Sequence, residues 1–186
     1  VLLDASKYVA TNFLDLSKRE NQADFIVFSA YKVFGYPMGI GALLVKNSSS
    51  HLLKKSYFGG GTVEFSTADL QRHKLRTTLH EAFEDGTLPY LNIIALNHAL
   101  KIVPRLISGG ISSDEHYMQI VQKHTFYLAN KLYSQLSELK HFNGSSVCVF
   151  YDKHYTHDMN QQGSIVNFNL KRSSGRFVGY GEVSQA

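Results

Sequence analysis

The chain has 186 residues, 44% of them hydrophobic, which is enough to bury the core of one domain or of parts of two. Its formal net charge is +4, but the basic residues are scattered, so the charge indicates ordinary solvated surface and no nucleic-acid partner. No apolar run approaches the roughly 20 residues that cross a bilayer, and the N-terminus lacks the zones of a signal peptide. The single cysteine, Cys148, cannot form an internal disulfide. We therefore expect a soluble, cytoplasmic protein that does not bind membranes.

The first half of the chain is rich in predicted strands. Three apolar runs have the composition of strands: residues 1–3, which end at Asp4, residues 25–28, which are closed by Ser29, and residues 39–45. The first run reads as a buried strand without a preceding turn, so we expect the chain to begin inside a domain. Residues 48–55 predict a short helix, and the polar stretch 67–84 is expected to be helical in places. This order predicts part of an α/β sheet.

The second half contains helices followed by strands. Residues 91–106 have helical spacing, although Pro104 is expected to end or kink that helix. Ser112 and Glu115 match a capping box before a long helix, whose apolar stripe from Met118 to Leu139 is predicted to face a core. Two strands, 147–151 and 165–170, follow. We place a domain boundary near Ser108.

Chemistry-bearing side chains follow two of the predicted strands, where ligands collect in open α/β sheets. Asp4 closes the first strand, and Lys32 lies just beyond Ser29 at the end of the second. The intervening chain is long enough for one crossover, so a carboxylate and a lysine could face one cleft. This pair suits pyridoxal phosphate (PLP), because lysine forms an imine with the cofactor and a carboxylate keeps its pyridine nitrogen protonated. The alternative is a surface lysine and a capping aspartate.

Residues 24–45 (DFIVFSAYKVFGYPMGIGALLV) resemble the cofactor-lysine motif of class V aminotransferases and cysteine desulfurases. Within that superfamily the chain looks closest to the eukaryotic molybdenum cofactor sulfurases. Tyr31 replaces the histidine that usually precedes the lysine, and residues 83–87 (FEDGT) replace the usual Arg-Ser-Gly-Thr. Residues 58–62 (FGGGT) and the segment from Ile165 to Tyr180 also fit, so the resemblance covers nearly the whole chain.

The resemblance implies the α/β fold of fold-type I PLP-dependent transferases, which is like that of aspartate aminotransferase. Residues 1–107 would be the C-terminal part of the large PLP-binding domain, and residues 108–186 part of the small α+β domain. It also implies a PLP-dependent sulfurtransferase that takes sulfur from L-cysteine through a persulfide and passes it to the molybdenum cofactor. A related cysteine desulfurase or selenocysteine lyase, or a non-catalytic interaction fragment of the PLP fold, remains an alternative. The family's persulfide cysteine, its substrate-carboxylate arginine and its molybdenum-cofactor domain have no counterpart here, so we expect these residues alone to be inactive.

Site residues can be carried over by motif. The resemblance implies that Lys32 is the Schiff-base lysine, that Asp4 is the partner of the pyridine nitrogen, and that Ser29 is a phosphate ligand. Tyr31 would replace the phosphate contact of the usual histidine. Thr87 resembles the threonine that reaches the phosphate of the neighbouring subunit, which implies a homodimer. The structural alternatives are a capping residue for Asp4, a turn serine for Ser29 and a helix N-cap for Thr87.

Other candidates are weaker. The glycines at 59–61 suit either an anion-binding nest or a flexible interface loop. Lys7 stands where desulfurases usually have a glutamine, and no role is assigned to it. Cys148 lies in an apolar predicted strand and reads as a buried inert thiol, not as a sulfur carrier. His154 and His157 lack a third ligand at a recognisable spacing, so no metal site is expected.

Overall fold

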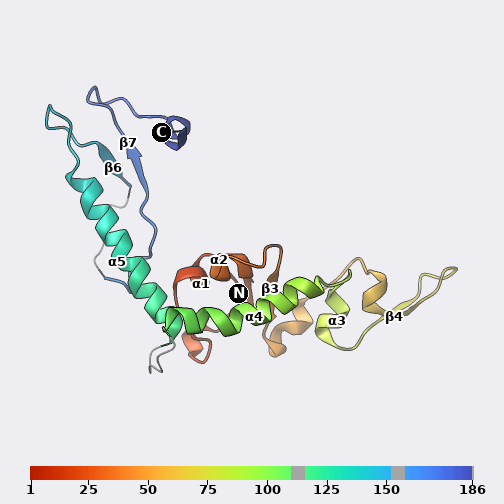
Figure 1. Cartoon of the computed structure of the whole chain (residues 1–186). Coiled ribbons are helices and arrows are strands. Elements are labelled where there is room, and N and C mark those ends of the chain that lie inside the picture. The colour runs from red at the N-terminus through yellow and green to blue at the C-terminus, as the bar shows by residue number, and fades with distance from the viewer. Residues whose placement is uncertain (110–115, 152–157, 186) are drawn as a thin grey trace. The chain divides into compact units, whose positions relative to one another are not determined.

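A computed structural model describes residues 1–109, 116–151 and 158–185 of the chain (Figure 1). The chain divides into two compact units, Val1–Ala10 with Leu14–Leu106, and Thr11–Phe13 with Ile107–Ala186. The main division lies one residue from the boundary predicted by the sequence. The assignment of the two units to the large and small domains of a PLP enzyme stays a prediction.

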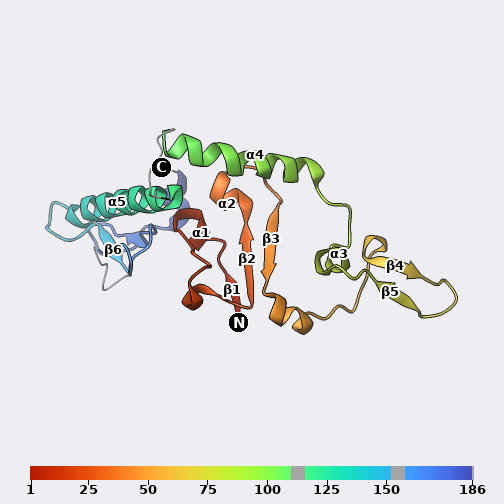
Figure 2. The ribbon, with the colours of Figure 1, turned by 90° about the horizontal axis from the view of Figure 1, so that it is seen from below.

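The first unit is built on a three-stranded sheet of order β1-β2-β3 (Figure 2). The strands are β1 (Leu2–Asp4), β2 (Phe25–Ser29) and β3 (Gly41–Val45), as the sequence predicts within two residues. β1 pairs parallel with β2, and β3 pairs antiparallel with β2. Asp4 lies opposite Val27, two residues before β2 ends. The crossover between the parallel strands contains α1 (Tyr8–Thr11) and a 3₁₀ helix (Arg19–Asn21).

A short helix, α2 (Ala30–Phe34), begins directly at the carboxyl end of β2. It ends at Gly35, whose φ of 72° is left-handed and whose N–H donates to the carbonyl of Tyr31 at 2.8 Å. The chain then turns back into β3, and the N–H of Ala30 donates to the carbonyl of Ile40 at 3.0 Å. These bonds hold both ends of the turn and therefore fix the residues that follow β2.

The rest of the first unit contains a hairpin that the sequence analysis missed. The hairpin consists of the antiparallel strands β4 (Val63–Ser66) and β5 (His73–Leu75). The same part of the unit also contains 3₁₀ helices at Asn47–Leu52 and Gly60–Thr62 and the helices α3 (Leu79–Phe83) and α4 (Tyr90–Ile107). Only α3 is helical in the stretch for which helix was expected. Pro104 lies inside α4, and the helix continues for three residues beyond it. Asn92 of α4 donates to the carbonyl of Met38 at 3.0 Å and ties the helix to the turn after α2.

The second unit contains α5 (Tyr117–Glu138), the antiparallel strands β6 (Cys148–Phe150) and β7 (Phe168–Leu170), and α6 (Tyr180–Gln185). The ring of His116 accepts a hydrogen bond from the N–H of Met118 at 3.2 Å, and the N–H of His116 donates to the side chain of Gln119 at 3.0 Å. This pair forms a capping box for α5. The predicted box of Ser112 and Glu115 lies outside the described residues.

Two predictions of burial are wrong. Val1 and Leu2 of the first strand are 85% and 65% exposed, because β1 is an edge strand that pairs only with β2 among the described residues. The apolar stripe of α5 is only partly core, since Met118 is buried whereas Leu128 is 48% exposed. Periodicity shows which face of an element is apolar, but it does not show what covers that face.

Gly41 permits the close approach of β3 to β2. A Cβ atom at this position would lie 2.7 Å from the backbone oxygen of Phe28, well inside normal contact. We predict that Gly41→Ala lowers the free energy of unfolding by about 1–3 kcal/mol, as overpacking does elsewhere. Gly163→Ala is the control, because a Cβ there meets no atom within 4 Å. Thermal unfolding of both variants checks this, and equal midpoints would contradict the predicted clash.

Candidate functional site

Asp4 and Lys32 lie at the same end of the sheet. The carboxyl ends of parallel strands meet at one edge, Asp4 is the last residue of β1, and Lys32 follows β2 within α2. The positive charge of Lys32 is close enough to help lower the pKa of the Asp4 carboxyl. Both side chains are exposed. The structure therefore brings together the carboxylate and the amine that the sequence analysis paired.

Ser6 hydrogen-bonds to the Asp4 carboxylate and lowers its pKa. The pKa of Asp4 lies below its ordinary value, first because the Ser6 hydroxyl hydrogen-bonds to it, then because of the Ser6 N–H, and to a smaller extent because of Lys32. The N–H of Ser6 donates to Asp4 Oδ1 at 2.9 Å. Asp4 thus does cap a turn, and the same hydrogen bonds lower the pKa of its carboxyl. Sequence reasoning missed Ser6, although aspartate followed two residues later by serine is a known turn pattern.

That turn pattern alone does not mark the site. Asp15 and Ser17 repeat it, with the Ser17 N–H donating to Asp15 Oδ1 at 2.9 Å. The pKa of Asp15 is lowered in the same way, chiefly by the Ser17 hydroxyl and then by its N–H. What distinguishes Asp4 is its place at the end of β1, beside Lys32.

Ser29, Tyr31 and Lys32 lie within four consecutive residues where β2 passes into α2. Ser29 occupies the N-cap position of α2, but its side chain makes no capping hydrogen bond to the helix. The simplest role of a turn serine, that of capping, is therefore not what this hydroxyl does. Tyr31 is 42% exposed at the same end of the sheet. These side chains and Asp4 are placed where they could hold a charged ligand.

Thr87 lies in a different part of the first unit. α4 begins at Tyr90, so Pro89 adjoins the helix and Thr87 is not its N-cap. Thr87 lines an open hollow of about 560 Å³ together with Gly61, Arg76 and Asp85. Neither Asp4 nor Lys32 lines this hollow, which is compatible with a role of Thr87 toward a neighbouring subunit.

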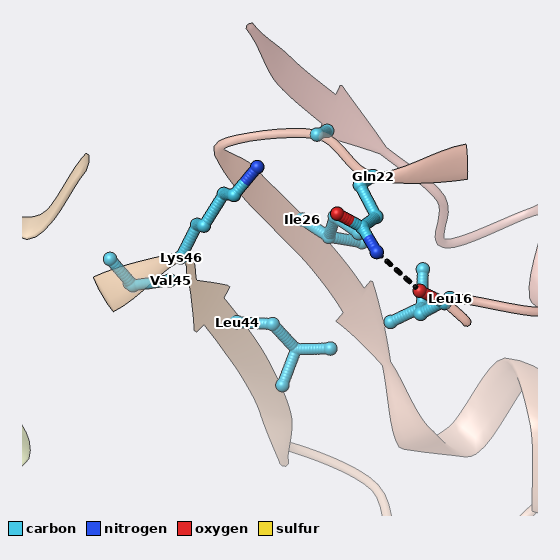
Figure 3. A pocket seen from close by; sticks show the side chains of 7 residues that line it. Leu16, Gln22, Ile26, Leu44, Val45 and Lys46 are labelled. Carbon is cyan, nitrogen blue, oxygen red and sulfur yellow. Dashed lines mark hydrogen bonds between the residues drawn. The ribbon is translucent and has the colours of Figure 1, made fainter. Parts of the chain in front are cut away.

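A second hollow lies at the opposite end of the sheet from Lys32 (Figure 3). Its walls include Ile26 near the start of β2 and Leu44 near the end of β3, and Gln22 at its rim donates to the carbonyl of Leu16 at 3.2 Å. Its volume of about 180 Å³ lies below the roughly 300–1,000 Å³ of typical ligand pockets. We assign it no cofactor role.

Cys148 is buried in β6 of the second unit, only 7% exposed. Burial raises the pKa of its thiol above the ordinary value. Both features support the interpretation of an inert thiol. Within the described residues no three His, Cys, Asp or Glu side chains are grouped as metal ligands would be, and no helix is long and apolar enough to cross a membrane. His154 and His157 lie outside the described residues.

Comparisons with known proteins agree on the family and on the fold. The family "Aminotransferase class-V" matches residues 1–179. The molybdenum cofactor sulfurase of Bombyx mori is 46% identical over 98% of the chain, and that of Drosophila grimshawi is 41% identical over 99%. The apo structure of a cysteine desulfurase from Thermococcus onnurineus NA1 has a TM-score of 0.65 at 20% identity, covering 91% of this chain and 36% of its own. The expected fold-type I architecture is thereby confirmed.

The chain spans 22–23% of the length of these two curated relatives. The similarity therefore covers one part of each relative, although it covers nearly all of this chain. The family match at residues 1–179 includes every residue that the sequence analysis assigned to the site.

The buried thiol gives a direct test of the second unit. We predict that Cys148 is alkylated at least about tenfold more slowly in the folded protein than in denaturant, because a raised pKa lowers the thiolate fraction and burial blocks access. The measurement is the rate of iodoacetamide labelling at mildly alkaline pH, with glutathione as the reference thiol. Equal rates before and after unfolding would show a reactive, accessible thiol.

Proposed function

Because the chain belongs to the class V aminotransferase family, we propose that it carries the cofactor lysine, Lys32, of a PLP-dependent sulfurtransferase of the molybdenum cofactor sulfurase type. The remainder of that enzyme would be supplied by segments outside these 186 residues. The observation that carries the proposal is the parallel pairing of β1 with β2, which places Asp4 and Lys32 at one end of the sheet. The relatives' names support the sulfur chemistry, and the site geometry supports the cofactor.

The residues present fit PLP. Lys32 would bond covalently to the cofactor, Asp4 would face its pyridine nitrogen, and Ser29 with Tyr31 would contact its phosphate. The Asp4 carboxyl suits this role because it is negative at neutral pH, and the Ser6 hydrogen bonds favour that ionised form further by lowering its pKa. When bound, PLP supplies an electron sink for the substrate carbon. An ionised carboxylate at the ring nitrogen strengthens that sink.

The proposed substrate is L-cysteine, and the proposed products are alanine and a persulfide whose sulfur passes to the molybdenum cofactor. Cys148 is not the proposed sulfur carrier, because its thiol is buried and its pKa is raised. Thr87 would reach the phosphate bound by a second copy, so the proposed assembly is a homodimer. The proposed compartment is the cytoplasm, in keeping with a single free thiol.

Lys32→Ala is the variant that tests this function. In the full-length protein that contains this chain, we expect it to abolish the visible absorbance of bound PLP and the release of alanine from L-cysteine, because the covalent attachment is lost. Lys46→Ala is the control, since Lys46 lies beside the hollow at the opposite end of the sheet. Retained absorbance in Lys32→Ala would remove Lys32 from the site. Turnover of selenocysteine but not cysteine by the unsubstituted protein would favour a selenocysteine lyase.

A further inference from the structure

Asp85 joins two loops that are distant in the sequence. The Lys55 ammonium donates to Asp85 Oδ1 at 2.5 Å, and the N–H of Gly59 donates to the same oxygen at 2.7 Å. Lys55 also donates to the carbonyl of Ala82, near the end of α3, at 2.9 Å. One carboxylate thus ties the glycine loop at 59–61 and Lys55 to the segment that follows α3.

The charges in this contact are matched. The Lys55 side chain is only 10% exposed, so its ammonium depends on a partner for its charge. The pKa of Asp85 lies below its ordinary value, first because Lys55 hydrogen-bonds to it and next because of the Gly59 N–H. Both hydrogen bonds therefore favour the ionised form of the carboxylate. Removing either charge would leave the other one partly buried without compensation.

Backbone packing brings the same two loops together independently of the charges. A Cβ atom at Gly59 would lie 2.4 Å from the backbone oxygen of Asp85, so only glycine fits. Thr62, which is completely buried, closes the loop by donating its hydroxyl to the carbonyl of Gly59 at 2.8 Å. By contrast, a Cβ atom at Gly60 would meet nothing within 4 Å.

Thr87 follows Asp85 after one residue, Gly86. Asp85, Gly86, Thr87 and Gly61 all line the same open hollow. Whatever fixes Asp85 therefore also restrains the backbone that leads to Thr87 at the wall of that hollow. Within the described chain, the bonds from Lys55 and Gly59 are what hold the Asp85 carboxylate, with the Thr62 hydroxyl more distant at 3.4 Å.

We propose that Lys55, Asp85 and Gly59 form a clamp that positions Thr87 to bind the phosphate group of the cofactor. The inference rests on the proposed function, because it takes the phosphate contact of Thr87 from there. Lys55 and Asp85 are positioning residues in this account, since they act through the backbone before Thr87. Gly59 then serves close packing against Asp85, a role that differs from both an anion nest and a flexible interface loop.

The test compares PLP with pyridoxal, which lacks the phosphate. In the full-length protein, Lys55→Met should weaken binding of PLP about tenfold and leave binding of pyridoxal nearly unchanged, because charged hydrogen bonds of this kind contribute at that scale. Lys54→Met is the matched control, since Lys54 is exposed next to Lys55. A merely structural role of the clamp would weaken both ligands equally.

Further variants distinguish the clamp from a general loss of stability. Gly59→Ala should reproduce the selective loss of PLP without removing a charge, whereas Gly60→Ala should retain the thermal stability of the parent. In a Thr87→Ala background, Lys55→Met should cause no additional selective loss, because the two act through one contact. Equal loss of both ligands, no loss, or full additivity with Thr87→Ala would overturn the clamp.

Comparison of ligand binding between the parent and Lys32→Ala separates this inference from the function on which it rests. Pyridoxal binding that depends on Lys32, combined with any of the contrary results above, would overturn the clamp and leave the proposed function intact. Absence of Lys32-dependent binding of either ligand would overturn the proposed function and the clamp with it.

Discussion

The parallel pairing of β1 with β2 is the constraint on which the candidate site depends. In a parallel pair both carboxyl ends point to the same edge, so Asp4 and the residues after Ser29 meet although more than twenty positions separate them. An antiparallel arrangement would place Asp4 at the start of β2, far from Lys32. The hydrogen bond from the Ser6 N–H then holds the Asp4 carboxylate, and the turn through Gly35 ends the short helix that carries Lys32.

Much of this site is predictable from the sequence, because its elements are short and their ends carry distinctive residues. Asp4 and Ser29 close apolar runs that form strands, and Lys32 follows within one helical turn. The lowered pKa of Asp4 was not predictable, since it depends mainly on the hydrogen bonds from Ser6. The repeat of the same pattern at Asp15 and Ser17 shows why local sequence cannot separate a site from an ordinary turn.

The features that sequence reasoning missed depend on contacts between distant segments. β4 and β5 are only four and three residues long, and β5 lies in a polar stretch, so their pairing is set by the partner strand and not by local pattern. The contact between Lys55 and Asp85 spans thirty positions. The exposure of apolar side chains was also not predicted. Leu2 and Leu128 belong to apolar patterns, yet they are 65% and 48% exposed, because burial depends on what packs against them. Pro104 was expected to end or kink its helix, but α4 contains it in its last turn and continues to Ile107.

The central claim is that Asp4 and the cofactor attached at Lys32 share one site, and the protonation of the cofactor's ring nitrogen reports on it directly. The measurement is the nitrogen-15 chemical shift of labelled PLP bound to the full-length protein, compared between the parent, Asp4→Asn and Asp15→Asn. The account predicts a protonated nitrogen in the parent and in Asp15→Asn, whose Asp15 lies in a like turn away from Lys32. It predicts a shift toward the unprotonated value in Asp4→Asn, because an amide cannot stabilise the positive ring. An unchanged shift in Asp4→Asn would contradict the claim.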